Sequence, residues 1–315
     1  MNRTPGTGKY EALLARCRSL EPVPTAVVHP CEETALAGAV DAARQGLIVP
    51  MLVGPEAKIR EVAKAHRIHL GHLQIVDVPH SHAAAARAVE LVRQGKAELL
   101  MKGSLHSDEL LGAVVARETG LRTGRRISHV FIMDVPTYHK VLVVTDAAIT
   151  IAPTLEDKVD ICQNAIDLLI SLGMTRPKVA ILAAVETITS KMPATLDAAA
   201  LCKMADRGQI TGGILDGPLA LDNAISPEAA KTKKIHSPVA GRANILVVPD
   251  LEAGNMLAKS LSFLAGADGA GIVLGARVPI ILTSRADVVT TRLASCAVAA
   301  LIAKARREAP ATAVA

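Results

Sequence analysis

The segment PIILTSRADVV holds the residues best suited to chemistry in this 315-residue chain. A buried strand is predicted to end at Thr283, and a helix to begin with Ser284, Arg285 and Asp287 in its first turn. A helix N-terminus gathers unpaired N–H groups, and the Arg285 guanidinium can grip two phosphate oxygens. The segment therefore predicts an anion site with Ser284, Arg285 and Asp287 as its catalytic candidates. The same Ser-x-x-Asp spacing is equally that of a capping box, in which Ser284 and Asp287 only satisfy backbone donors.

A second candidate is the segment LLMKGSLHSDEL, where a strand is predicted to end at Lys102 and Gly103 and a helix to begin near Ser107. Ligands of parallel sheets gather at the carboxyl ends of the strands. Lys102, Ser104 and His106 are therefore expected to face the same crevice as Ser284. A solvated surface loop is the alternative.

Two basic runs are further candidates for binding an anion. Arg122, Arg125 and Arg126 in GLRTGRRIS fall at a predicted domain junction, and such junctions are preferred ligand sites. The run KTKKIH, residues 231–236, is predicted to be a polar surface loop. A solvated surface is the alternative for the three arginines as well.

Predicted strands and helices alternate along the first hundred residues, which is an α/β pattern. Strands are predicted at 25–28, 47–54, 73–78 and 97–101, and helices at 33–46, 56–66 and 82–95, the last one closed by Gly95. Repeated strand–helix–strand units predict a parallel sheet.

The pattern changes at residues 127–134 and 139–146, which are predicted to form two adjacent antiparallel strands. Further strands are predicted at 178–185, 210–217 and 243–250, with helices at 155–173, 194–205 and 251–265. In GADGAGIVLG, residues 266–275, Gly269 and Gly271 are predicted to lie in a loop that precedes a strand. A last helix, from about Arg285 to Ala305, is expected to return to the first domain. The predicted fold is two doubly wound α/β domains with a cleft between them: residues 1–127 with 272–315, and an inserted domain of residues 128–271.

Composition excludes several classes of protein. The chain has no Trp and only two Tyr and two Phe, so it lacks the stacking platforms of single-stranded nucleic-acid binders. A net charge of +5 suits a small phosphate-bearing substrate. No apolar run reaches the length of a membrane span or a signal peptide, and five scattered cysteines predict reduced thiols of a cytoplasmic protein. His66, His69 and His72 are expected to be solvated, and no metal site is predicted.

Several longer segments resemble the phosphate acetyl/butyryltransferase family. The resemblance runs from about Ala26 to Ile302 and is strongest in PDLEAGN and SRAD; VFIMDVP, VTDAAITIAPTLEDKVDICQNAI, ILDGPLALDNAIS and MKGSLHS are also similar to family segments. KMPATLDAAAL and SRAD look closer to the butyryl type than to the acetyl type.

The resemblance implies reversible acyl transfer, in which acyl-CoA and phosphate give acyl phosphate and CoA, with no tightly bound cofactor and no metal. It implies that Ser284 and Arg285 act at the site with a downstream Asp, for which Asp287 is the candidate although the family's Asp lies further along the helix. Substrate binding is implied for Lys102, Gly103, His106, Asn255 and an arginine. Arg122 is the candidate for that arginine, with Arg125 and Arg126 as alternatives.

The chemistry of the implied reaction sets roles for these groups. A thiol has a pKa near 8.5 and a free Asp near 3.9, a gap of roughly 4.6 units or ~6 kcal/mol, so Asp287 is expected to orient or partly accept the proton. Arg285 stays charged and can grip phosphate. Ser284 would hydrogen-bond a developing oxyanion.

Two other functions remain open. One is a non-catalytic acyl-CoA-sensing module of the same fold, and the other is an NAD(P)-dependent dehydrogenase on a related scaffold. The acyl group, acetyl or butyryl, is left open. A homodimer is expected, with neither nucleic acid nor membrane as a partner.

Overall fold

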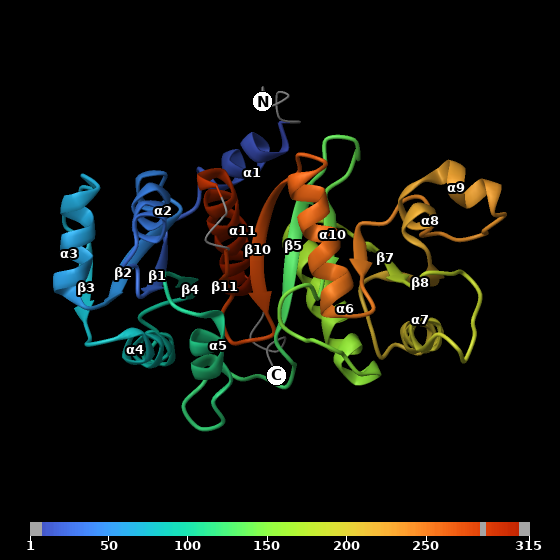
Figure 1. The fold of residues 1–315 in the computed structure, drawn as a ribbon, viewed down its shortest axis with the longest axis horizontal. Helices are drawn as coiled ribbons and strands as arrows, with labels where there is room; N and C mark the ends of the chain where they lie inside the picture. Colours follow the sequence, from blue (N-terminus) through green and yellow to red (C-terminus); the bar gives the residue numbers. More distant parts are fainter. Residues whose placement is uncertain (1–7, 284–287, 309–315) are drawn as a thin grey trace. The chain divides into compact units, whose positions relative to one another are not determined.

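The computed structural model describes residues 8–283 and 288–308 (Figure 1). The chain forms two compact units. One consists of Gly8–Arg125 with Ala270–Ala315 and is called the split unit here, because it uses two stretches of chain; the other, Arg126–Gly269, is called the middle unit. Each unit is a sheet covered by helices, so the chain is an α/β protein as predicted.

The sheet of the split unit is largely parallel, with strand order β3-β2-β1-β4-β11-β10. The first four strands arise from the alternating strand and helix pattern predicted for residues 25–101, and β10 is antiparallel to β11. The strands are β1 Val23–Val28, β2 Ile48–Gly54, β3 Gln74–Asp77, β4 Leu99–Lys102, β10 Asp268–Leu274 and β11 Ile280–Ile281.

Helices cover this sheet in two groups. Helix α11 packs on α1 and α2, and α2 packs on α3, whereas α4 packs on α5. In α4 the apolar residues recur at helical spacing, and Gly95 follows with a φ of 70°, a left-handed value that suits the glycine after a helix. The helices are α1 Lys9–Cys17, α2 Glu33–Arg44, α3 Glu56–Ala65, α4 Ser81–Arg93, α5 Ser107–Val115 and α11 Val289–Glu308.

The Gly-rich segment 266–275 corrects the sequence prediction. The predicted loop is a strand from Asp268 onward, because Ile272 and Val273 are fully buried and pair with β11. Burial and pairing with a neighbouring strand here outweigh the weak strand propensity of glycine. Local composition therefore misplaced the start of this strand.

The sheet of the middle unit has the order β5-β6-β9-β7-β8. Its β5 and β6 are antiparallel neighbours, which confirms the prediction for residues 127–146, and the other pairs are parallel. The strands are β5 Ser128–Asp134, β6 Leu142–Thr145, β7 Lys178–Leu182, β8 Ile214–Leu219 and β9 Ile245–Val247.

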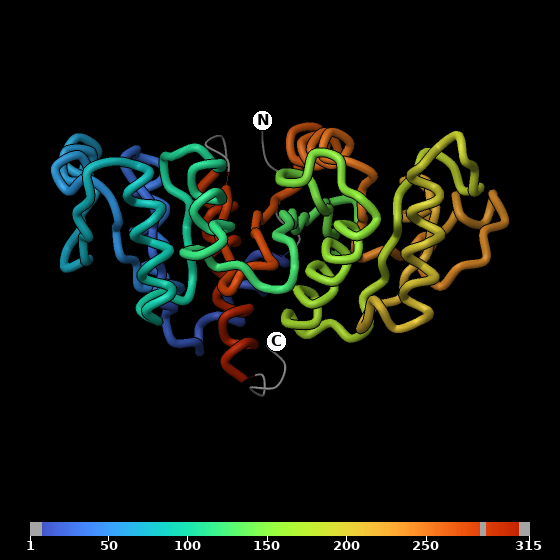
Figure 2. Tube along the Cα trace, turned by 90° about the horizontal axis from the view of Figure 1, so that it is seen from below, coloured from blue at the N-terminus to red at the C-terminus, as the bar shows by residue number. Residues whose placement is uncertain are grey.

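Two helices of the middle unit are fixed by their N-caps. The Thr154 hydroxyl accepts from the Asp157 amide at the start of α6, and the Asp250 carboxylate accepts from the Ala253 amide at the start of α10. Figure 2 shows α10 and α6 on opposite sides of the strands. The helices are α6 Leu155–Ser171, α7 Pro193–Asp206, α8 Leu221–Ile225, α9 Pro227–Thr232 and α10 Leu251–Phe263.

The short helices α8 and α9 were not predicted. Lys231 and Thr232 of the predicted loop KTKKIH belong to α9, whose first turn is capped by the Ser226 hydroxyl. Over the part of the chain that the structure describes, no helix combines the length and apolarity needed to cross a membrane.

Candidate functional site

Three strands of the split unit end at one edge of its sheet. Val28 of β1 is level with Lys102 of β4, and Ile281 of β11 is level with Met101. The residues that follow these strands, His29, Gly103 and Thr283, are therefore neighbours at the carboxyl edge, where parallel sheets bind ligands. Ser284, Arg285 and Asp287 lie outside the described residues, but Ser284 directly follows Thr283 in the chain.

Gly103 is required by the backbone at this edge. A Cβ built on Gly103 would lie 2.3 Å from the carbonyl oxygen of Val28 and 2.6 Å from that of His29. The amides of Gly103 and Ser104 donate to these two carbonyls, each at 2.9 Å. Lys102, one residue earlier, is 7% exposed. The structure thus gives Gly103 a packing role, and substrate binding by Lys102 and Gly103 stays a prediction.

His106 lies beyond this turn, at the N-cap of α5, with its side chain exposed. Its backbone amide donates to Oε1 of Glu109 at 3.2 Å. The Ser81 hydroxyl donates to the other carboxylate oxygen of Glu109 at 2.5 Å, and these hydrogen bonds hold the pKa of Glu109 below its usual value. A contact between His106 and substrate stays a prediction.

The sequence did not predict the polar network that lies beside Gly103. The Ser104 hydroxyl donates to the His29 carbonyl at 2.7 Å and accepts from the Cys31 amide at 2.9 Å, and the His29 imidazole Nδ1 lies 3.4 Å from the same hydroxyl. The three residues come from two separate segments of chain. Their proximity depends on the pairing of β1 with β4.

Arg292 is a second functional candidate that the sequence did not single out. It lies in the first turns of α11, is 4% exposed, and donates from Nη1 to the Thr283 hydroxyl at 3.1 Å. Gly38 of α2 makes room for it, since a Cβ there would be 2.9 Å from Cδ of Arg292. A guanidinium keeps its charge even when buried. Arg292 therefore places a fixed positive charge beside the residue that precedes Ser284.

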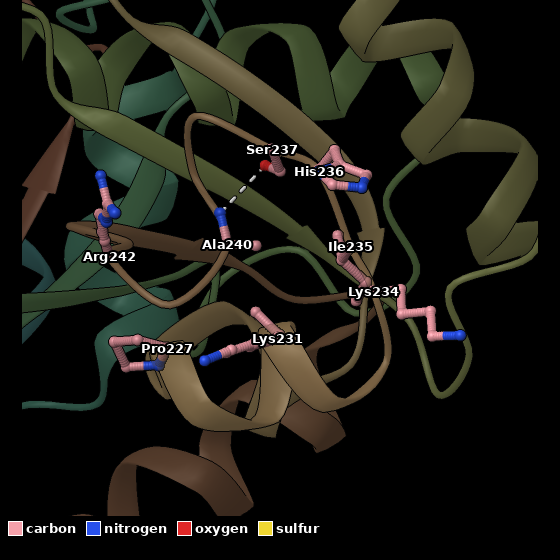
Figure 3. A pocket seen from close by; sticks show the side chains of 9 residues that line it. Pro227, Lys231, Lys234, Ile235, His236, Ser237, Ala240 and Arg242 are labelled. Atoms are coloured by element: carbon pink, nitrogen blue, oxygen red, sulfur yellow. Dashed lines mark hydrogen bonds between the residues drawn. The ribbon is translucent and has the colours of Figure 1, made fainter.

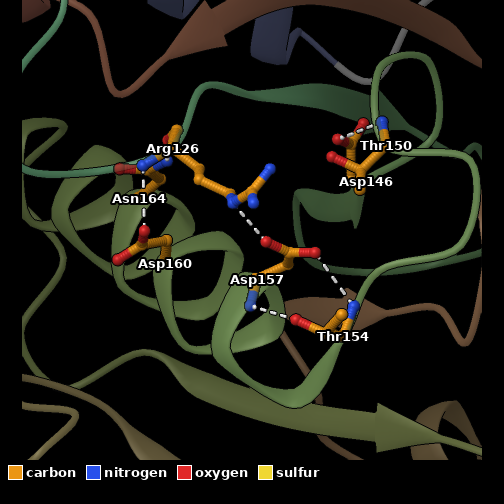
Figure 4. Close-up of polar contacts among 7 residues, drawn as sticks. All are labelled: Arg126, Asp146, Thr150, Thr154, Asp157, Asp160 and Asn164. Carbon is orange, nitrogen blue, oxygen red and sulfur yellow. Dashed lines mark hydrogen bonds and ion pairs between the residues drawn. The ribbon is translucent and has the colours of Figure 1, made fainter.

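The three arginines of GLRTGRRIS have different surroundings. Arg122 is exposed and its backbone bridges to Ala276 within the split unit. Arg126 belongs to the middle unit, where its side chain forms an ion pair with Asp157 and its amide donates to Asp160 at 2.9 Å (Figure 4). Arg125 is exposed. Ala276 follows β10, which is antiparallel to β11, so Arg122 lies at the opposite end of β11 from Thr283, and phosphate binding by Arg122 stays a prediction.

The carboxyl edge of the middle unit is organised by Asp146. Its carboxylate, 2% exposed, accepts from the amides of His129, Ala148, Ile149 and Thr150 at 3.0–3.2 Å. Three of these four amides belong to the residues that follow Asp146 in the chain. Asp146 therefore fixes the loop that follows β6.

The PDLEAGN motif also contacts the loop that follows β6. The Asn255 amide of α10 donates to the Ala147 carbonyl at 3.2 Å, and a Cβ on Gly254 would lie 3.0 Å from Cβ of Ala147. Asp250, the first acidic residue of the motif, caps α10. The structure thus assigns Asn255 a role in holding this loop, and its contact with substrate stays a prediction.

A basic cavity of about 360 Å³ lies in the middle unit, between α9 and the loop that leads to β9 (Figure 3). The Ser237 hydroxyl shapes this loop by accepting from the amides of Val239 and Ala240, both at 3.0 Å. Since Arg242 precedes β9, the cavity is near the amino ends of the strands, away from Asp146. It is lined by Pro227, Ala230, Lys231, Lys234, Ile235, His236, Ser237, Ala240 and Arg242.

The thiols of the chain are poor nucleophiles. All five cysteines are unpaired, and burial raises the pKa of Cys31 to about 11 and that of Cys296 to about 12. Thiolate is the reactive form, so these groups are almost entirely protonated at neutral pH. Within residues 8–283 and 288–308, no cluster of three or more His, Cys, Asp or Glu side chains could hold a metal ion.

Comparisons with known proteins identify the family. A family model described as "Phosphate acetyl/butaryl transferase" matches residues 79–300. The phosphate acetyltransferase of Rhizobium meliloti is 67% identical over 306 residues, covering 97% of each chain. The phosphate butyryltransferase of Clostridium acetobutylicum is 40% identical over 294 residues, covering 93% of this chain and 98% of that protein.

A solved structure agrees with these two relatives. The crystal structure of a branched-chain phosphotransacylase from Enterococcus faecalis superposes with a TM-score of 0.79 at 29% identity, and the match covers 89% of this chain and 99% of that one. The family model and the relatives each span most of the chain. The chain therefore belongs to the phosphate acetyl/butyryltransferase family, and it is a phosphate acyltransferase.

Proposed function

We propose that the chain transfers an acetyl group reversibly between coenzyme A and inorganic phosphate, at the carboxyl edge of the split unit. The observation that carries this location is the strand register, which makes His29, Gly103 and Thr283 neighbours. Ser284 and Arg285 come next after Thr283 in the chain, which supports this location for the predicted catalytic pair.

In this proposal the positive charges at the edge bind the phosphoryl group. Arg285 grips two of its oxygens through its planar guanidinium, and Lys102 adds charge from the end of β4. The buried Arg292 contributes a fixed charge behind Thr283. Ser284 donates a hydrogen bond to the oxyanion that develops on the acyl carbon.

CoA is the proposed acyl acceptor and donor, and no tightly bound cofactor is proposed. The high pKa values of the chain's own cysteines support transfer directly between the two substrates, without an acyl group on a cysteine. Asp287 is proposed to orient the thiol. Asn255 is proposed to act through the loop after β6, which it holds.

Acetyl is the proposed acyl group because identity is 67% to a phosphate acetyltransferase and 40% to a phosphate butyryltransferase. A cytoplasmic homodimer is also proposed. Five unpaired cysteines support a reducing compartment, and light scattering should give twice the chain mass of 32.8 kDa.

A coupled assay of CoA release tests the function. The purified chain is mixed with phosphate and acetyl-, propionyl- or butyryl-CoA in the presence of a chelator. We expect phosphate-dependent release, with the highest kcat/KM for acetyl-CoA. No release with any of the three would favour a sensing module, and a higher kcat/KM for butyryl-CoA would overturn the acetyl assignment.

A further inference from the structure

The reaction needs a group that accepts the proton of the CoA thiol, and the carboxylate of Asp287 is poorly matched to that task. A free Asp and a thiol differ by roughly 4.6 pKa units, whereas an imidazole and a thiol differ by only about 2. General bases work best when their pKa is near the operating pH. A histidine at the carboxyl edge would therefore suit the reaction better.

His29 lies at this edge in an unusual backbone conformation. Its φ is 55°, in the left-handed region that non-glycine residues seldom adopt. The turn fits because Gly103 has no side chain. Gly54, at the end of β2, also packs closely, since a Cβ built on Gly54 would lie 3.4 Å from Cα of His29. Such conformations concentrate at functional sites, because the surrounding structure must offset their cost.

The hydrogen bonds of Ser104 determine which imidazole nitrogen carries the proton. The single hydroxyl proton of Ser104 is directed at the His29 carbonyl, 2.7 Å away. The 3.4 Å contact with Nδ1 is therefore made with Nδ1–H as the donor and the hydroxyl oxygen as the acceptor. In this tautomer the lone pair that can accept a proton is on Nε2. Ser104 is thus a positioning residue and not a nucleophile activated by His29.

Partial burial keeps the imidazole of His29 mostly neutral at neutral pH. Partial burial is the largest cause that lowers its pKa from 6.5, and Lys58 of α3 lowers it further. Glu109 of α5, a hydrogen bond with the backbone of Ser104, and Glu32 ahead of α2 oppose this lowering of the pKa without reversing it. At neutral pH the side chain is therefore mostly in the form that can accept a proton.

We propose that Nε2 of His29 is the general base of the transferase reaction and accepts the proton of the CoA thiol. As the sulfur attacks acyl phosphate, the S–C bond forms, the C–O bond to phosphate breaks, and phosphate leaves with the electron pair. The proton remains on His29 until it passes to phosphate or solvent. In the reverse direction the imidazolium returns the proton to the CoA sulfur. The assignment rests on CoA being the thiol substrate.

The test replaces His29 by a residue that keeps the turn. His29→Asn suits the left-handed backbone and removes the base, and His72→Asn, at an exposed position away from this edge, is the matched control. We expect His29→Asn to lower kcat for thiolysis of acetyl phosphate by about 10²- to 10⁴-fold at pH 7, with an unchanged melting temperature. His72→Asn should match the wild type.

The pH profile separates a base from a structural residue. In the wild type, kcat/KM should decline on the acid side as His29 gains its proton, below pH 6.5 because its pKa is lowered. This acid limb should disappear in His29→Asn. The deficit of the variant should shrink as the pH approaches about 8.5, where the thiol ionises without help.

The possible negative results distinguish the proposed function from the role of His29. A wild-type chain without CoA-dependent turnover would refute the proposed function itself. An active wild type, with a His29→Asn variant of equal rate or of a constant deficit at every pH, would refute His29 as the base. If His29→Asn does not fold, Ser104→Ala takes its place, and an unchanged acid limb with an unchanged rate in that folded variant would also overturn the assignment.

Discussion

At the residue scale, the carboxyl edge of the split unit contains two positively charged side chains. Lys102 and Arg292 are buried cations, with exposed fractions of 7% and 4%. Positive charge at this edge suits the proposed phosphoryl group. Ser284 and Arg285, which follow Thr283 in the chain, have separable proposed roles there.

Ser284 can be tested because catalysis and helix capping give different results. Ser284→Ala should cost roughly 1 kcal/mol of stability if the hydroxyl is only an N-cap, with little change in rate. As an oxyanion donor it should instead lower kcat by about 10²- to 10³-fold.

Ser284→Asp is the sharper control, since Asp caps a helix as well as Ser does. We expect a variant with wild-type melting temperature and no turnover, because the new carboxylate repels phosphate. Normal turnover in this stable variant would remove Ser284 from the active site. Thermal unfolding and the CoA-release assay measure both properties.

Arg285→Lys should raise KM for phosphate far more than KM for CoA. A point charge then replaces a planar fork that fits two phosphate oxygens. Steady-state kinetics with each substrate varied in turn gives the comparison. An unchanged KM for phosphate would mean that the anion binds elsewhere, and Arg122 would be the next position to replace.

At the element scale, the site depends on how closely β4 and its following turn approach β1. Hydrogen bonds from Gly103 and Ser104 to the carbonyls of Val28 and His29 join the two strand ends. In the middle unit, the His129 amide donates to Asp146 and the Asn255 side chain donates to the Ala147 carbonyl, which holds the loop after β6 in a comparable way. Both edges are thus shaped by contacts between segments distant in sequence.

Gly103→Ala should disrupt the first of these contacts. A Cβ at 2.3 Å and 2.6 Å from two carbonyl oxygens forces the backbones apart, so we expect a loss of about 1–3 kcal/mol in unfolding free energy and a lower kcat. Gly112→Ala in α5 is the matched control. Nothing lies within 4 Å of a Cβ there, and the helix should gain up to about 1 kcal/mol. Equal stability of the two variants in denaturant titrations would contradict this packing argument.

At the scale of the whole molecule, both units contain a carboxylate whose pKa is lowered by hydrogen bonds. The Ser81 hydroxyl lowers the pKa of Glu109 in the split unit, and the Lys233 ammonium, 2.7 Å away, lowers that of Glu186 in the middle unit. A carboxylate with a lower pKa in the folded state binds fewer protons there than in the unfolded chain. Each group therefore adds stability above its unfolded pKa.

Stability should consequently fall in acid. The contribution of each carboxylate is present above pH 4.5 and is lost as the pH falls through its lower folded pKa. Denaturant unfolding should show Glu109→Gln and Glu186→Gln to be less stable than the wild type near neutral pH, with the difference vanishing in acid. A difference that grew in acid would contradict the sign of both shifts.

The local elements and the family were predictable from the order of residues in the chain. The helical spacing over 82–95 and the alternating strands and helices over 25–101 gave the elements that the structure contains. The antiparallel pair at 127–146 was predictable because both strands and their short connection are contiguous in the chain. The SRAD and PDLEAGN segments indicated the family through residue types alone. These features depend on neighbours within a few turns of chain.

Only the tertiary structure singled out His29 and Arg292 and brought Ser104 against His29. Each gains its role from a partner far away in sequence: His29 from Ser104, and Arg292 from the space left by Gly38. The start of β10 was mispredicted for the same reason, since strand pairing and burial outweighed local composition there. Local propensity acts over a few residues, whereas a site is assembled from strand ends that meet only when the sheet has formed.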